Sequence, residues 1–382
     1  MLALRLARGS HPLAQLRRLM VAAASAGVGF LLLCTLGNAM AQPEGSLVRL
    51  LWCIVPLAAT VHLAVAVART DPSTRPRPGL SAIGLGPARL SAVAAASTAV
   101  SCTLGSMVAL LLFLHLRGDL TGLPFDGAAA ELLAADRPLP LAGALTLLSL
   151  VPLCAATASA LALRPRRVPP AESEAETVTR QPDGLPWGMA LVAAGLAVEA
   201  YASRGGTGAA VALPGRPDAG PTGVLAGWAL TALGLALAGP GLTYFCGRLL
   251  QSARPGAMRL LAGRALQQEA GRIGRPLGVL CTALSGALAL ATLYDAGSGA
   301  DVLGPLTGLG VALVMGCATA TLLTATVEAR HARTETTETL LRLGTPVKLL
   351  RGAAVLRAAA LLAVFAPVTW SIAHLAALPL TT

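Results

Sequence analysis

Long apolar runs separated by short polar segments recur along the entire chain. An α-helix rises about 1.5 Å per residue, so about 20 apolar residues cross the ~30 Å hydrocarbon core of a bilayer. The pattern predicts about nine membrane-spanning helices, with ten as the alternative number. The expected spans cover residues 19–40, 47–68, 90–116, 139–163, 187–203, 223–247, 277–297, 303–327 and 352–378.

The composition agrees with this pattern. Hydrophobic residues make up 55% of the 382 residues, charged residues make up 12%, and the mean hydropathy is +0.69. A soluble protein of this length is far less apolar. We therefore predict an all-α, polytopic integral membrane protein, in which small residues let helix backbones approach one another closely.

Arginine carries almost all of the positive charge. Lysine and arginine number 29 against 18 acidic residues, and Lys348 is the only lysine. The arginines are spread through many short loops, which argues against nucleic-acid binding. They concentrate in alternate loops, so the positive-inside rule places the N-terminus in the cytoplasm. The abundance of Ala, Gly, Pro and Arg is typical of a GC-rich bacterial genome, and we expect a multi-pass protein of the bacterial plasma membrane.

Two stretches in the first part of the chain match two stretches in the second part at nearly one spacing. In the first match, an arginine-bearing segment runs into a span, and Arg18 falls on Arg275. In the second, the stretch from Arg77 to Leu90 falls on the stretch from Thr336 to Leu349, which pairs Pro87 with Pro346. Both matches keep the same orientation, so they predict a parallel repeat of two halves.

This repeat divides the chain into four predicted segments. The first half holds four spans, and the Pro-rich cytoplasmic segment that follows has the composition of a flexible linker. Two connecting spans then lead to a second half with three spans, which lacks a counterpart of the fourth. In chain order these segments are residues 1–163, 164–186, 187–252 and 253–382.

A charged segment between the last two spans predicts a helical hairpin. Apolar residues of this segment cluster on one helix face, and Gly344 with Pro346 predicts a break at the turn. Two interpretations stay open from the residues alone. The amphipathic element either receives force from a soluble partner or lies on the lipid headgroups.

The hairpin motifs resemble those of a known family. LLRLGTPVKLL from Leu340, LSAIGLGPARL from Leu80 and the preceding LLAGRALQQEAGRIGRPLGVL are similar to the FtsX-like permease domain of bacterial ABC transporters. Many members carry a large external domain, whereas the outer loops expected here are short. The resemblance implies a permease subunit on which a cytoplasmic ATPase docks, as a dimer on one permease chain with both hairpins. The implied ATPase-coupling residues are Leu80, Ile83, Pro87, Arg89, Glu335, Glu338, Leu340, Leu341, Arg342, Leu343, Gly344, Pro346 and Lys348.

The residues themselves argue against catalysis in this chain. A phosphate-binding P-loop needs GxxxxGK[ST], but the only lysine lies in GTPVKL. No Ser-His-Asp, paired-carboxylate or HExxH pattern appears. The seven cysteines and the isolated histidines lack metal-ligand spacing. We therefore expect no cofactor in this chain, with ATP and Mg²⁺ bound by the partner ATPase.

Glu199 is a carboxyl expected within the fifth span. An ionisable group at this depth is a functional candidate, because burying its charge is costly. Arg204 follows five residues later. The favoured interpretation is an ion pair that reaches the outer membrane interface.

The expected function is export or extraction of an amphiphilic substrate, either a peptide or a lipid. The alternative is a membrane regulator that does not transport but passes force from the ATPase to an extracytoplasmic partner. A secondary transporter is disfavoured, because the interior has almost no charge that could couple ion flow. Besides the ATPase, the expected partner is membrane lipid.

Overall fold

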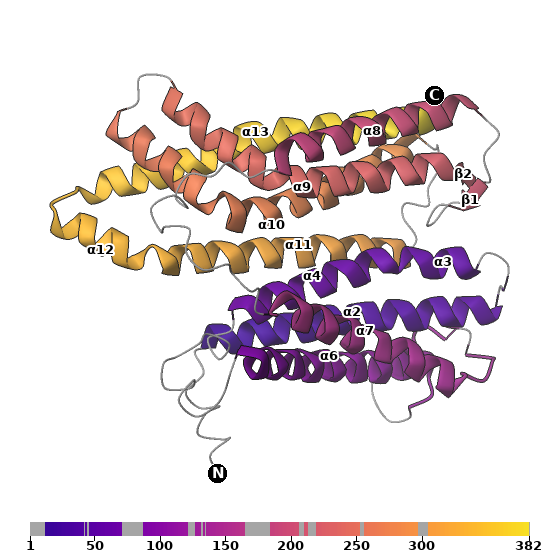
Figure 1. Ribbon diagram of the computed structural model, residues 1–382. Coiled ribbons are helices and arrows are strands. Elements are labelled where there is room, and N and C mark those ends of the chain that lie inside the picture. Colours follow the sequence, from indigo (N-terminus) through magenta and orange to yellow (C-terminus); the bar gives the residue numbers. More distant parts are fainter. Residues whose placement is uncertain are drawn as a thin grey trace, which may run out of the picture. The chain divides into compact units, whose positions relative to one another are not determined.

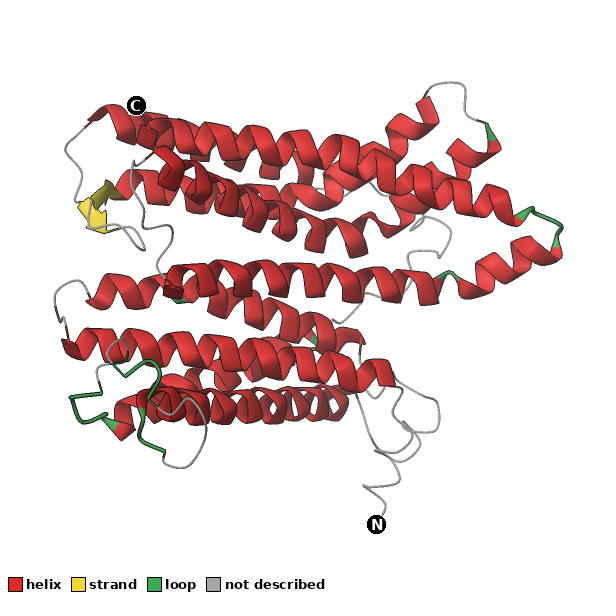
Figure 2. Cartoon of the chain, turned by 180° about the vertical axis from the view of Figure 1, so that it is seen from behind, coloured by secondary structure: helices red, strands yellow, loops and turns green. Residues whose placement is uncertain are grey.

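The chain is described by a computed structural model in which helices dominate (Figure 1, Figure 2). The described residues are 12–41, 43, 46–70, 87–120, 127–130, 133, 135–164, 184–205, 210–212, 219–252, 256–296 and 305–381. Their elements are α2 (Pro12–Ala41), α3 (Ser46–Trp52), α4 (Ile54–Thr70), α6 (Pro87–Arg117), α7 (Leu141–Ala162), α8 (Gly184–Gly205), β1 (Ala210–Ala212), β2 (Ala219–Pro221), α9 (Thr222–Ser252), α10 (Ala257–Ala296), α11 (Pro305–Ala332), α12 (Thr334–Arg342) and α13 (Val347–Thr381).

The predicted fold class is confirmed. Within the described part of the chain, nine helical segments are long and apolar enough to cross a membrane, with α3 and α4 together forming one of them. The only strands there are β1 and β2, which form a short antiparallel pair. The protein is therefore an all-α, multi-pass membrane protein.

The second expected span is interrupted where α3 ends at Trp52. Pro56 lies four residues after Trp52. A proline ring inside a helix clashes with the carbonyl group of the residue four positions earlier, which is Trp52 here. Leu57 then resumes the helical pattern by donating its N–H to the Cys53 carbonyl at 3.1 Å. A sequence that reads as one span thus becomes two helices.

The seventh span is longer than its apolar run predicts. α10 continues unbroken from Ala257 to Ala296, so the arginine-bearing segment before residue 277 belongs to the same helix. Pro276 lies inside α10 and is buried. α10 packs closely on α9 on both sides of this proline, through Gly263 and Gly278. Such packing lets a membrane helix continue through a proline.

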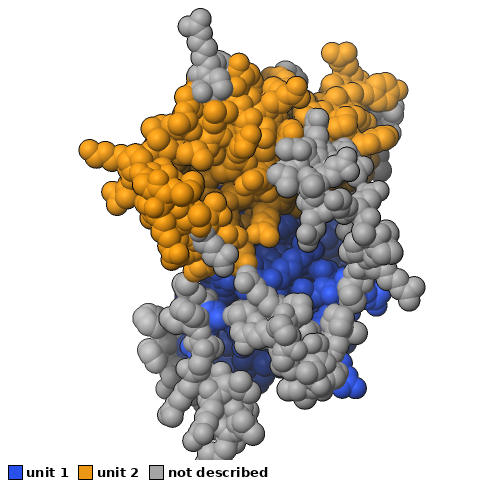
Figure 3. Space-filling model, turned by 60° about the vertical axis from the view of Figure 1, so that its left-hand side comes forward, with its two compact units in different colours: residues 1–167, 303–324 blue, residues 168–302, 325–382 orange. Residues whose placement is uncertain are grey.

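The chain forms two compact units, which are coloured separately in Figure 3. Unit 1 comprises residues 1–167 and 303–324, and unit 2 comprises residues 168–302 and 325–382. The units divide the chain differently from the repeat, since α8 and α9 lie in unit 2 with α10 and α13. Most of α11 lies in unit 1, and its last turns lie in unit 2. The arrangement within each unit is described separately below.

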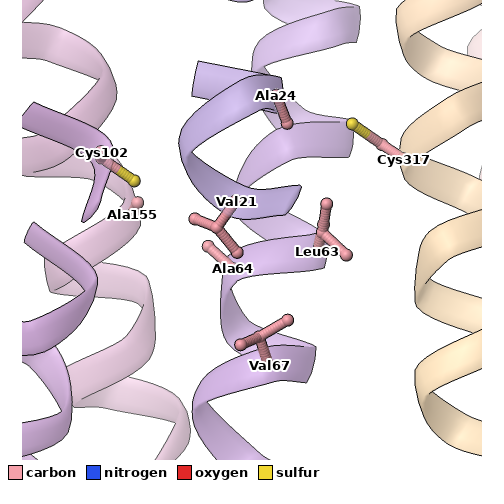
Figure 4. Close-up of a cluster of buried hydrophobic side chains, with 8 residues drawn as sticks. All are labelled: Val21, Ala24, Leu63, Ala64, Val67, Cys102, Ala155 and Cys317. Atoms are coloured by element: carbon pink, nitrogen blue, oxygen red, sulfur yellow. The ribbon is translucent and has the colours of Figure 1, made fainter. Parts of the chain in front are cut away.

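In unit 1, α2 packs against α4, α6 and α7. A core cluster joins these four helices to α11, and Figure 4 shows its members. They are Val21, Ala24, Leu63, Ala64, Val67, Cys102, Ala155 and Cys317. The buried Ser25 hydroxyl donates to the Cys102 carbonyl at 2.8 Å, which ties α2 to α6. Side-chain contacts and hydroxyl bonds of this kind hold membrane helices together where no water can drive association.

In unit 2, α9 lies between α8 and α10 at very short range. Glycines line both contacts. A Cβ atom at Gly188 of α8 would lie 2.6 Å from the Ala238 backbone nitrogen of α9. A Cβ atom at Gly274 of α10 would lie 2.5 Å from the Pro240 Cα atom. The absence of side chains at these positions lets the three backbones touch.

The predicted repeat pairs α2 with α10 and α6 with α13. Within unit 1, α2 packs on α6, and within unit 2, α10 packs on α13. Each unit therefore contains one helix pair of the kind that a parallel repeat requires. The repeat itself stays a prediction from the sequence.

Candidate functional site: a hairpin and its ionic anchor

The predicted hairpin is present as the short helix α12 between α11 and α13, at the left of Figure 1. Its end has the hydrogen bonds of a Schellman cap. The N–H of Thr345 donates to the Leu340 carbonyl, and the N–H of Gly344 donates to the Leu341 carbonyl, both at 3.0 Å. Gly344 has φ +86°, a left-handed conformation that glycine adopts without a steric penalty. The break expected at this glycine is therefore confirmed.

The apolar side chains of the hairpin are not equally covered. Leu343 is 77% exposed, and Leu341 and Val347 are also exposed. Leu340 is half-buried. We call Leu341, Leu343 and Val347 the hairpin tip. Exposed apolar side chains of this size, from the end of α12 to the start of α13, are typical of an interaction surface.

The other implied coupling residues of the second hairpin lie in the same segment as the hairpin tip. Four of them are exposed, namely Glu338, Arg342, Pro346 and Lys348. Glu335 is a residue of α12. The structure thus brings together the implied coupling residues of the second hairpin on one short segment.

The first hairpin is described only at its end. Leu80 and Ile83 lie outside the described residues. Pro87 is the first residue of α6, where the missing N–H of proline is tolerated. Arg89 follows in the first turn with an exposed side chain.

An ion pair anchors the base of the hairpin. Arg333 stands at the break between α11 and α12, and its Nε and Nη2 groups contact the two carboxylate oxygens of Glu269 on α10. Arg333 Nε also lies 3.2 Å from the Ala329 carbonyl of α11, to which it donates. Such a two-pronged contact fixes geometry better than a single charge contact. The start of α12 is therefore tied to the first third of α10.

Glu269 interacts with three arginines, of which Arg333 is one. It is only 8% exposed, and Arg272 and Arg357 also interact with it electrostatically. Arg357 is a half-buried residue of α13, so the cluster joins α10, α13 and the hairpin. We call Glu269, Arg272, Arg333 and Arg357 the ionic anchor.

Sequence reasoning missed this ionic anchor. It assigned no contact to Arg333 and no role to Glu269. One signal was present, because Glu269 is the only acidic residue between Asp218 and Asp295. An isolated acid in a segment rich in arginine indicates a paired group.

The structure corrects the interpretation of Glu199. Its side chain is 1% exposed and turns toward α9, where the Thr231 hydroxyl donates to Oε1 at 3.2 Å. A Cβ atom at Gly227 would lie 2.4 Å from the Glu199 Cγ atom. Arg204 is exposed instead. Glu199 is therefore a helix-packing group and not half of an interfacial ion pair, because glycine and threonine leave room for it inside unit 2.

A second buried charge lies in unit 1, at the end of α6. Arg117 contacts the Arg137 carbonyl through Nη2 and lies 3.4 Å from Asp119 through Nε. Arg137 in turn contacts the carbonyl of Met40, the residue before the last of α2. These bonds fasten the segment before α7 to the ends of two helices, which is a structural role.

The described residues hold no group of three or more His, Cys, Asp or Glu side chains that could bind a metal ion. Comparisons of the chain with protein-family models, curated proteins and solved structures gave no match. The candidate site therefore rests on the hairpin, the ionic anchor and the chemistry of their side chains.

Proposed function

We propose that this chain is the permease subunit of a bacterial ABC transporter of FtsX-like type, with its N-terminus in the cytoplasm. A separate ATPase subunit binds the hairpin tip, and ATP and Mg²⁺ belong to that subunit. The observation that carries the proposal is an exposed apolar tip on a short capped helix whose base is held by the Arg333 contact with Glu269. A helix lying on headgroups would need no such anchor.

The contacts suggest a path for force. Displacement of α12 by the ATPase reaches α10 through Arg333 and Glu269. It reaches α13 through the short turn that ends at Pro346, because α13 begins at the next residue. α10 and α13 pack against each other, so both receive the displacement near the same end. The hairpin thus acts as a lever on two spans.

The repeat supports one permease chain for each pair of ATPase subunits, since both hairpins belong to one polypeptide. The short outer segments and the apolar spans favour an amphiphilic substrate, either a peptide or a lipid. The alternative function, a membrane regulator that does not transport, would use the same contact with the ATPase.

The ATPase contact is tested by co-expressing the chain with a candidate ABC ATPase subunit from the same genome and purifying the complex. Leu343→Glu with Leu341→Glu should remove the ATPase from the purified complex, because a charge in an apolar contact lacks a partner. Thr336→Glu with Thr339→Glu is the matched control, since it adds the same two negative charges at exposed positions of α12. Full ATPase binding by the double variant would exclude the hairpin tip as the docking surface.

Transport and regulation are separated by measuring ATP hydrolysis by the complex in proteoliposomes. Stimulation by an added amphiphilic peptide or lipid supports transport. Stimulation only by an extracytoplasmic protein supports the regulator.

A further inference from the structure

The ionic anchor carries more positive charge than its single carboxylate can balance. Arg333 contacts both oxygens of Glu269. Arg272 and Arg357 add two further positive charges in range of the same carboxylate. Among the described residues, Glu269 is the carboxylate with which Arg357 interacts. Within the ionic anchor as the structure describes it, three guanidinium groups therefore face one carboxylate, and a partly buried cation such as Arg357 is unfavourable without a full counter-charge.

The position of the ionic anchor along α10 and α13 indicates its depth in the membrane. Residues 358–378, which follow Arg357 on α13, contain no Asp, Glu, Lys or Arg. These 21 residues span about 31 Å of helix, which is about the thickness of the hydrocarbon core. On α10, residues 276–294 are equally free of such charges. The arginines thus lie where the hydrocarbon ends and the lipid phosphates begin.

Arg357 is also accessible from the side of α13. Ala354 and Ala358 flank it, and both are exposed. Their small side chains cover little of the α13 surface beside Arg357. Arg272 is exposed and lies one helical turn from Glu269 on α10, so it shares a face with that carboxylate.

We propose that Arg357 and Arg272 bind the phosphate group of an anionic phospholipid at this boundary. A phosphate oxygen pair matches the planar fork of arginine, and its charge supplies the missing counter-charge. Basic sites between spans at the membrane boundary recognise anionic headgroups in this way. The proposal requires only that the helices span a bilayer, and it does not depend on the ATPase partner.

The lipid site places a ligand next to the hairpin's anchor. The phosphate and the Glu269 carboxylate attract the same arginines, so an occupied site shares Arg357 between the two anions. The strength of the contact between α10 and α13 should therefore differ between membranes with and without anionic lipid. This consequence is specific to a headgroup at this position.

The test uses the purified full chain in detergent, titrated with phosphatidylglycerol and followed by native mass spectrometry. Wild type should bind phosphatidylglycerol in preference to phosphatidylcholine and to inorganic phosphate. Arg357→Gln should weaken phosphatidylglycerol binding about tenfold, the loss expected for one hydrogen bond to a charged group. Arg272→Gln should also weaken it, and this exposed position keeps the test valid if the first variant does not fold.

Arg248→Gln provides the matched control, because Arg248 is an exposed arginine near the end of α9 that does not interact with Glu269. It should leave the dissociation constant unchanged. Equal weakening in all three variants would show adsorption to basic residues in general and overturn the proposal. Equal binding of inorganic phosphate would reassign the site to a free anion, and equal binding of phosphatidylcholine would show that the negative charge of the lipid is not recognised.

Discussion

Units 1 and 2 are both bundles of membrane-spanning helices, but their helices are held together differently. In unit 1, contacts run mostly through side chains, such as Leu33 and Phe113 in a core cluster of α2, α6 and α7. In unit 2, α8, α9 and α10 are in contact backbone to backbone along glycines. Unit 1 has a similar close approach at Gly105, where a Cβ atom would lie 2.2 Å from the Ala22 carbonyl oxygen.

This difference affects how readily the helices of each unit can move against one another. Side chains can change rotamer when a neighbouring helix moves, whereas two touching backbones cannot adjust without separating. The three helices α8, α9 and α10 therefore form a firm platform in unit 2. The hairpin and α13 attach to this platform through the ionic anchor and apolar contacts, so a force on the hairpin has a fixed element to act against.

The largest expected effect comes from breaking the platform. Gly274→Ala should lower the free energy of unfolding by about 3 kcal/mol, the upper part of the range for overpacking, because its neighbours are the backbone atoms of Gly239 and Pro240. Gly271→Ala is the control on the same helix, where a Cβ atom meets nothing within 4 Å. It should be neutral or stabilising by about 0.5 kcal/mol through helix propensity. Thermal unfolding in detergent measures both, and equal stability of the two variants would contradict the backbone contact.

A smaller effect is expected at the ionic anchor. Glu269→Gln should destabilise unit 2 by about 2 kcal/mol, since it removes a charge-assisted contact and leaves partly buried arginines without their carboxylate. Glu338→Gln, at an exposed position of α12, should change stability by less than about 0.5 kcal/mol. Chemical unfolding of the two variants compares them. If Glu269→Gln left the free energy of unfolding unchanged, the contact between Glu269 and Arg333 would not hold the hairpin.

The smallest effect is expected in unit 1. Ser25→Ala should cost about 1 kcal/mol, because it removes the hydroxyl that donates to the Cys102 carbonyl while that carbonyl keeps its helical bond. Thr103→Val is a suitable comparison, as this exposed hydroxyl bonds only within α6. The same unfolding assay applies. A loss as large as that of Gly274→Ala would remove the contrast between the two units.

Much of the fold could be predicted from local patterns. Runs of about 20 apolar residues predicted all nine spans found in the described residues, because span length depends only on bilayer thickness and helix rise. The end of α12 was also predictable, since Gly344 favours the left-handed conformation of a helix cap. The apolar character of the hairpin tip could be read from Leu341, Leu343 and Val347, although which of the hairpin's leucines are exposed could not.

The contacts of the charged side chains could not be predicted in the same way. Glu269 and Arg333 are 64 residues apart, and no helical period relates them. The expected partner of Glu199 was Arg204, its sequence neighbour, whereas the observed partner is Thr231, which lies 32 residues away. Proximity in sequence suggested a pair, but the orientation of α8 on α9 decided which group the carboxyl meets.

Hydrophobic length and turn chemistry are local properties, so the order of residues is enough to predict a bundle of membrane helices with a charged, capped hairpin. Which helices lie backbone to backbone and which carboxylates are buried depends on how the helices pack. Those outcomes depend on the rotation of each helix about its own axis. That rotation is set by small residues such as Gly227 and Gly274, whose effect appears only when another helix is present.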